Sequence, residues 1–148
     1  MSTIREEMPL LVRHEGEWEG NYKIIDNNGN LVDEHRVNIS VQFPENSPYA
    51  FQLVNKYQWD NGKFEEYYFP ATYRDKKIWF DTERLQGYAW EADDSIVLMW
   101  FTYKSSPDIS MYEVIQLSPC GNYRYRTMHL LKNHQVFKLT LMQEHRVN

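Results

Sequence analysis

The sequence has a single cysteine, Cys120, among its 148 residues. One thiol can form neither an internal disulfide nor a thiolate metal cluster, so both are excluded. No apolar run reaches the length that crosses a bilayer, and no apolar stretch follows a basic region at the N-terminus. We therefore predict no membrane span, no secretory signal and a cytoplasmic location.

Positive charge is also in short supply, because 16 Lys and Arg against 21 Asp and Glu give a formal net charge of −5. A nucleic-acid partner is not expected, since such proteins present a basic face to phosphates. Nucleophile elbows, P-loops and dinucleotide fingerprints are absent. We predict no metal and no cofactor, because no ligand spacing connects the five histidines, which are His14, His35, His129, His134 and His145.

Aromatic residues are abundant, at 16% of the chain with eleven tyrosines. They fit pleated surfaces and favour a sheet-rich fold, and Tyr and Trp can also line a cavity with an apolar body and a polar tip. Within residues 14–26, Trp18, Gly20, Tyr22 and Ile24 alternate with polar residues. This period of two predicts a strand with one buried face.

Turn signals recur along the rest of the chain, and no ten-residue helical pattern follows Arg13. Such dipeptides are typical of hairpins because their residues tolerate positive φ. We predict a single all-β domain over residues 1–148, an antiparallel up-and-down β-barrel of about nine or ten strands. A capping box at Thr3 to Glu6, interrupted by Pro9, predicts a short N-terminal helical segment across one open end. The turn signals are Asn28-Gly29, Asn61-Gly62, Asp75-Lys76, Asp93-Asp94, Cys120-Gly121 and Asn133-His134.

The turns also predict register, because a shift of one residue would move a whole apolar set to the other face. A two-residue loop at Asn28-Gly29 places Tyr22 opposite His35 and Ile24 opposite Asp33. In the same way, the loop at Asn61-Gly62 places Tyr57 opposite Glu66 and Asn55 opposite Tyr68.

The later hairpins place Gly87 opposite Trp100, and they align three strands on an apolar face that contains Glu113 and Arg126. On the last strand this face continues through Phe137, Leu139 and Leu141.

The predicted inner face is too polar for a packed sandwich, because charges removed from water are costly unless they are paired or wetted. We therefore expect a partly polar pocket that contains water. Glu113 and Arg126 either form an ion pair in the lumen or contact the ligand. The expected ligand-binding residues are Trp18, Tyr22, His35, Asn55, Tyr57, Tyr68, Trp100, Glu113 and Arg126.

Several segments resemble an uncharacterised bacterial family of lipocalin-like (calycin-type) β-barrel domains. They are the runs 13–22, 28–30, 33–36, 69–75, 90–94 and 112–119. The wider calycin resemblance implies that a first-strand tryptophan, here Trp18, packs against a basic residue near the last strand. Arg146 fills this role only if the last strand bulges, because its parity differs from that of Leu141. Some such barrels hold haem through one histidine, so His14 or His35 stays an alternative.

Two functions stay open at this point. The first is binding of a small, largely apolar molecule, such as a pigment, lipid or secondary metabolite, in the barrel lumen. The second is an isomerase, cyclase or lyase in the same lumen, with His35, Asp33 or Glu66 as acid or base. A homodimer through an outer apolar patch of Tyr73, Tyr88 and Trp90 is a third possibility.

Overall fold

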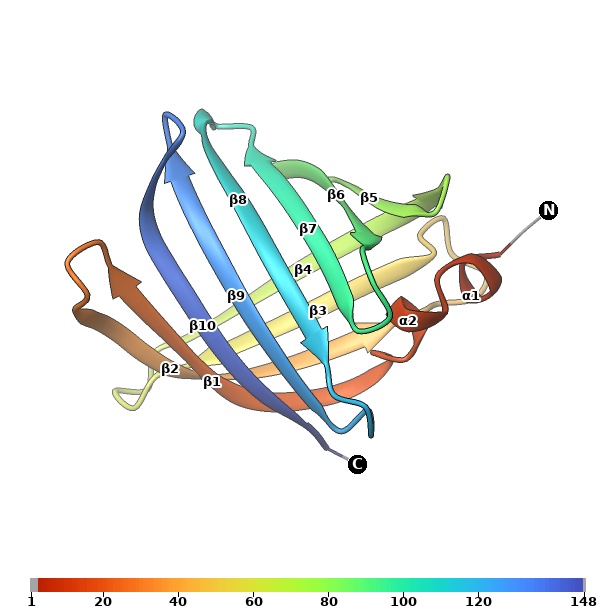
Figure 1. The fold of residues 1–148 in the computed structure, drawn as a ribbon, viewed down its shortest axis with the longest axis horizontal. Coiled ribbons are helices and arrows are strands. Elements are labelled where there is room, and N and C mark those ends of the chain that lie inside the picture. The colour runs from red at the N-terminus through yellow and green to blue at the C-terminus, as the bar shows by residue number, and fades with distance from the viewer. Residues whose placement is uncertain (1–2, 148) are drawn as a thin grey trace.

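The computed structural model describes residues 3–147. Two short helices come first in the chain, and ten strands follow that form a closed antiparallel β-barrel (Figure 1). Each strand pairs with its neighbours in the chain, and β1 also pairs with β10, so the sheet has no free edge. The all-β up-and-down architecture is therefore confirmed. The strands are β1 (Gly16–Asp26), β2 (Leu31–Gln42), β3 (Phe51–Gln58), β4 (Phe64–Arg74), β5 (Lys77–Asp81), β6 (Leu85–Glu91), β7 (Ile96–Tyr103), β8 (Ser106–Leu117), β9 (Tyr123–Lys132) and β10 (Gln135–Val147).

The N-terminal segment forms α1 (Ile4–Glu7) and α2 (Pro9–Val12) at one end of the barrel (Figure 1). The Thr3 hydroxyl accepts a hydrogen bond from the Glu6 backbone N–H at 3.3 Å, as the predicted cap requires. Pro9 starts α2, where its missing N–H costs no helical bond. The Leu11 backbone N–H donates to the Glu91 carboxylate at 2.8 Å, which ties α2 to the end of β6.

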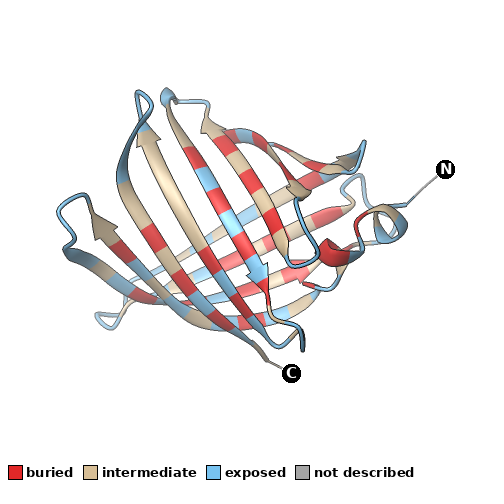
Figure 2. Ribbon diagram, viewed as in Figure 1, coloured by how far each residue is buried: buried red, intermediate tan, exposed pale blue. Residues whose placement is uncertain are grey.

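Burial alternates along most strands, as the colours of the ribbon show (Figure 2). The apolar core extends from the helices, through Met8 and Leu11, into the adjoining part of the barrel, where Trp18 is 1% exposed. At Gly20, β1 approaches β10 so closely that a Cβ atom would lie 1.9 Å from the Gln143 carbonyl oxygen. Glycine at this position permits the strong coiling that closes the barrel.

The β1–β2 register is as predicted, with Tyr22 opposite His35 and Ile24 opposite Asp33. The loop itself is one residue longer than expected, because the Asp26 backbone N–H donates to the Asn30 carbonyl. A β-bulge next to Ile24 then compensates for the extra residue.

The β3–β4 register is one residue away from the prediction. The Trp59 backbone N–H donates to the Lys63 carbonyl, which makes a three-residue loop with Gly62 at φ 89°. No bulge compensates here, so Tyr57 pairs with Glu65 and not with Glu66. The β6–β7 hairpin is shifted in the same way, and Gly87 lies opposite Phe101 and not Trp100.

The last three strands follow the predicted turns up to one irregularity. The β8–β9 register is confirmed, with Ile115 opposite Arg126, and the β9–β10 turn is at Asn133-His134, where both residues have positive φ. A bulge between Val136 and Lys138 then reverses the parity of β10. The predicted inner face of Phe137, Leu139 and Leu141 is therefore wrong, and the lumen side of β10 carries Lys138, Thr140, Met142 and Glu144.

Candidate functional site

The lumen holds a cavity of about 380 Å³ toward the end of the barrel away from the helices. Its volume falls in the range of about 300–1,000 Å³ that is usual for small-molecule sites. Apolar side chains, among them Met99, Phe101 and Met111, form one part of the wall. A polar and aromatic group around His35 forms another part.

His35, on β2, is held between aromatic rings of β1 and of the end of β3. Its ring stacks on Tyr22 at 4.5 Å between centroids and lies 4.1 Å from Trp59, and its Nδ1 is 3.0 Å from an Asp33 carboxylate oxygen. The Trp59 indole N–H donates to the same carboxylate at 2.9 Å. Burial lowers the pKa of His35, although the Asp33 carboxylate acts against this shift. The imidazole is therefore neutral at neutral pH.

Asn55 and Tyr57 form a second polar group on the wall. The Asn55 amide donates to the Tyr57 hydroxyl at 3.2 Å, and its Oδ1 has no hydrogen-bond partner within residues 3–147. Burial raises the pKa of Tyr57, so its hydroxyl stays protonated and can donate a hydrogen bond.

A buried ion network lies at the inner end of the cavity. Arg126 donates to Glu113 at 2.8 Å and to Glu144 at 3.0 Å, and Arg124 donates to the other Glu144 oxygen at 2.6 Å. Burial alone would raise the pKa of Glu144, but Arg124 and Arg126 outweigh it and hold the pKa below its usual value. The ion pair expected between Glu113 and Arg126 is present. Glu144 was missed because the β10 bulge has no evident sequence signal.

The opposite end of the barrel is closed by Trp18. The Arg124 and Arg146 guanidinium groups lie 4.8 and 4.4 Å from its ring, and its indole N–H donates to the His14 carbonyl at 2.9 Å. The calycin resemblance implied this closure by Arg146, and the bulge in β10 supplies the necessary parity. Trp18 is buried inside the barrel but does not line the cavity.

His14 lies behind this closure beside a void of only about 20 Å³. Burial, followed by the positive charge of Arg124, lowers the pKa of His14 to about 2. A void of this size has room for about one water molecule and none for haem.

Besides Trp18, three more of the candidate site residues do not line the cavity. The one-residue register shifts turn Glu66, Tyr68 and Trp100 to the outer face, and Tyr68 is 49% exposed. Their neighbours Glu65, Tyr67, Met99 and Phe101 line the cavity in their place. Arg84 and Lys138 also line it, and sequence reasoning gave neither of them.

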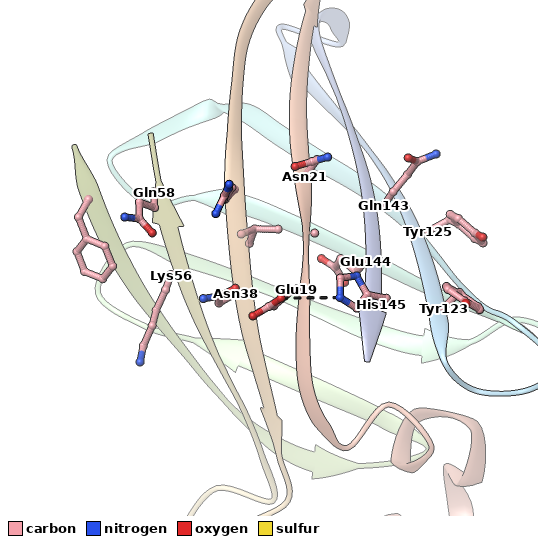
Figure 3. Close-up of a pocket in the computed structure, with 14 residues that line it drawn as sticks. Glu19, Asn21, Asn38, Lys56, Gln58, Tyr123, Tyr125, Gln143, Glu144 and His145 are labelled. Atoms are coloured by element: carbon pink, nitrogen blue, oxygen red, sulfur yellow. Dashed lines mark ion pairs between the residues drawn. The ribbon is translucent and has the colours of Figure 1, made fainter. Parts of the chain in front are cut away.

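The outer surface carries an aromatic cluster and a polar hollow. Tyr88 lies between Trp90 and Trp100 on the outside of β6 and β7, whereas Tyr73 packs against the core, so the predicted outer patch is only partly formed. The hollow, of about 590 Å³, crosses β10, β1, β2 and β3 and includes the exposed ion pair of Glu19 and His145 at 3.8 Å (Figure 3).

Within residues 3–147, no group of three or more His, Cys, Asp and Glu side chains is arranged to hold a metal ion. The same part of the chain contains no helix long and apolar enough to cross a membrane.

Residues 5–148 match the family model described as the N-terminal domain of unknown function DUF3598. The chain belongs to the DUF3598 family. A search of curated proteins finds no match.

Solved structures share the barrel of this DUF3598 domain. A DUF3598 protein of unknown function from Nostoc punctiforme PCC 73102 is 19% identical with a TM-score of 0.70, over 93% of this chain and 49% of that protein. The chain thus spans about half of the length of this relative. The S-type phycobiliprotein lyase CPES from Guillardia theta is 14% identical with a TM-score of 0.75, over 95% of this chain and 92% of the lyase. Rv2717c from M. tuberculosis is 9% identical with a TM-score of 0.65, over 96% and 98%.

Proposed function

We propose that this DUF3598 domain binds a small, largely apolar molecule in the barrel lumen. The observation that carries the proposal is the cavity of about 380 Å³, which combines an apolar wall with a few polar groups. A barrel that served only as a packed scaffold would fill this space with side chains.

The polar groups on the wall support a ligand that has a hydrogen-bonding group. A buried amide oxygen without a partner, such as Oδ1 of Asn55, costs about 1–3 kcal/mol. A donor N–H or O–H on the ligand would relieve this cost, and the protonated Tyr57 hydroxyl beside it can donate to a ligand oxygen.

A fluorescence titration with the uncharged apolar dye N-phenylnaphthylamine tests the proposal. We expect saturable binding to the wild-type protein. Met111 lines the cavity, so Met111→Trp should fill it and weaken dye binding about tenfold or more. The matched control is Val114→Trp on the outward face of the same strand, where the side chain is 37% exposed. Failure of the dye to bind, or equal weakening by both variants, would contradict lumen binding.

The contact between Asp33 and His35 favours a second candidate, an acid–base enzyme in the same lumen. A carboxylate at Nδ1 fixes the imidazole tautomer and leaves Nε2 as the base, as in other carboxylate–histidine pairs. The lowered pKa keeps this nitrogen unprotonated at neutral pH. The phycobiliprotein lyase with the same fold is, by its name, an enzyme on this type of barrel.

The enzyme hypothesis is tested by a screen for isomerisation, cyclisation or elimination of small apolar compounds. His35→Gln and Asp33→Asn should abolish any turnover while dye affinity changes less than about threefold. Turnover that persists in both variants would assign His35 a structural role.

A further inference from the structure

Two positive side chains line the cavity near its mouth. Arg84 precedes β6, in the turn after β5, and its guanidinium lies 4.8 Å from the centroid of Tyr67 and 5.4 Å from that of Phe69. Lys138 lies on β10, four strand positions away around the barrel, directly after the bulge that turns it toward the lumen. Within residues 3–147, neither has a carboxylate oxygen within 4.0 Å.

The carboxylates of the same cavity are already engaged. Asp33 accepts from Trp59 and contacts His35, and Glu65 accepts from the Tyr67 hydroxyl at 2.9 Å and pairs with Lys63 at 3.4 Å. Deeper in the lumen, Glu113 accepts two hydrogen bonds from Arg126. The anions of the wall therefore have their partners, while the two cations near the mouth do not.

We infer that the ligand of this cavity is an amphipathic organic anion, such as a carboxylate or a sulfonate, whose charged group lies between Arg84 and Lys138. This inference rests on the proposed lumen binding and adds the charge and orientation of the ligand. The apolar body points inward against Met99 and Met111, and the anion stays near water at the mouth. In this position the anion keeps part of its hydration, so its burial costs less than in the deep lumen. Guanidinium and ammonium groups supply charge-assisted hydrogen bonds to it.

The test compares two dyes with the same aromatic framework. Anilinonaphthalene sulfonate carries a sulfonate, and N-phenylnaphthylamine is its uncharged counterpart. The double variant Arg84→Gln with Lys138→Gln should weaken binding of the anionic dye about three- to tenfold and leave binding of the neutral dye within about twofold. Added salt should weaken binding of the anionic dye to the wild type and have less effect on the double variant.

The matched control removes the same two charge types from the outside of the barrel. Arg36 and Lys56 are exposed and line the outer hollow, in which Lys56 is drawn (Figure 3). The double variant Arg36→Gln with Lys56→Gln changes the net charge equally, so it should leave the affinity for both dyes unchanged. An equal loss of anionic-dye affinity in both double variants would show a response to net charge and would overturn the inference.

The two proposals fail in different ways. One outcome is that the neutral dye binds and is excluded by Met111→Trp, while the double variant Arg84→Gln with Lys138→Gln leaves the affinity for the anionic dye unchanged. In that case the lumen site stands and the anion inference falls. If neither dye binds the wild type, both proposals fall.

Discussion

Residues of the lumen show how this barrel retains charge inside. The Glu144 side chain is fully buried, and each of its two oxygens accepts from a different arginine of β9. A buried ion pair adds little net stability compared with apolar packing, but loss of one partner leaves an uncompensated charge.

Glu144→Gln should therefore destabilise the fold strongly. We expect a cost of about 3–5 kcal/mol in the free energy of unfolding, measured by urea titration. The control is Glu15→Gln, which breaks the surface ion pair with Arg5. The Arg5 side chain is 48% exposed and the Glu15 side chain is 44% exposed. That change should cost at most about 1 kcal/mol. Similar costs for the two variants would mean that solvent reaches the buried network.

His14 should make the stability depend on pH. In the unfolded chain its pKa is near 6.5 and in the folded protein it is about 2, so below pH 6.5 the unfolded state binds the additional proton. Stability due to His14 is therefore complete above pH 6.5 and declines as the pH falls toward 2. The loss reaches about 2 kcal/mol near pH 5.

The measurement is the free energy of unfolding at about pH 7 and pH 5. His14→Gln should show a smaller decrease than the wild type by about 2 kcal/mol. The exposed His134 provides the control, since His134→Gln should keep the wild-type pH dependence. An unchanged decrease in His14→Gln would show that His14 is protonated in the folded state.

At the scale of elements, turn chemistry predicted where strands reverse better than how they align. Both Asn-Gly loops have three residues between the paired backbone groups, yet only the β1–β2 pair regains the predicted register, through a bulge. The dipeptide is the same in both hairpins, so it could not distinguish them. His35 and Asp33 were placed correctly for this reason, and Glu66 and Tyr68 were not.

The bulge in β10 had a greater effect on the site. Patterning favoured the apolar parity of Leu139 and Leu141, but in the structure these residues are only half-buried, and Glu144 and Lys138 face the lumen. Glu144 accepts from Arg124 and Arg126 on β9, which lie 20 and 18 residues away along the chain, and these contacts require the bulged parity. Short-range sequence patterns do not indicate these contacts.

Deletion of Phe137 tests the role of the bulge. Without the extra residue, the strand beyond it should return to the unbulged parity, which turns Met142, Glu144 and Arg146 outward. We expect no cooperative thermal unfolding transition, because Arg124 and Arg126 lose their shared carboxylate and Trp18 loses a stacked cation. Deletion of Glu45, in the exposed loop between β2 and β3, is the control and should be tolerated. A native-like transition after deletion of Phe137 would show that the turn can slip to restore the register.

For the whole molecule, the barrel divides into a packed end and a hollow end. Helices, Trp18 and the ion network fill the first, whereas the second surrounds the cavity with fewer buried contacts. The sheet is closed, but only Ala71–Arg74 of β4 pair with β5, so the hollow end has fewer backbone pairs as well as looser side-chain packing. Local opening should therefore be easier at the mouth than at the helical end.

Amide hydrogen exchange, read by mass spectrometry, tests this division. Peptides that contain Tyr57–Lys63 and Leu130–Phe137 should exchange faster than peptides that contain Gly16–Gly20 and Ile115–Leu117, because their hydrogen bonds close the hollow end. Saturation with N-phenylnaphthylamine should slow exchange at the mouth, since a ligand that binds only the folded state stabilises it by about 2.7 kcal/mol at a hundredfold excess over Kd. Met111→Trp should slow amide exchange in the mouth peptides even without the dye, because its indole occupies the same space. Equal exchange rates at both ends would show that the hollow end opens no more easily than the packed end. Rates that neither the dye nor Met111→Trp changes would show that the dye binds elsewhere.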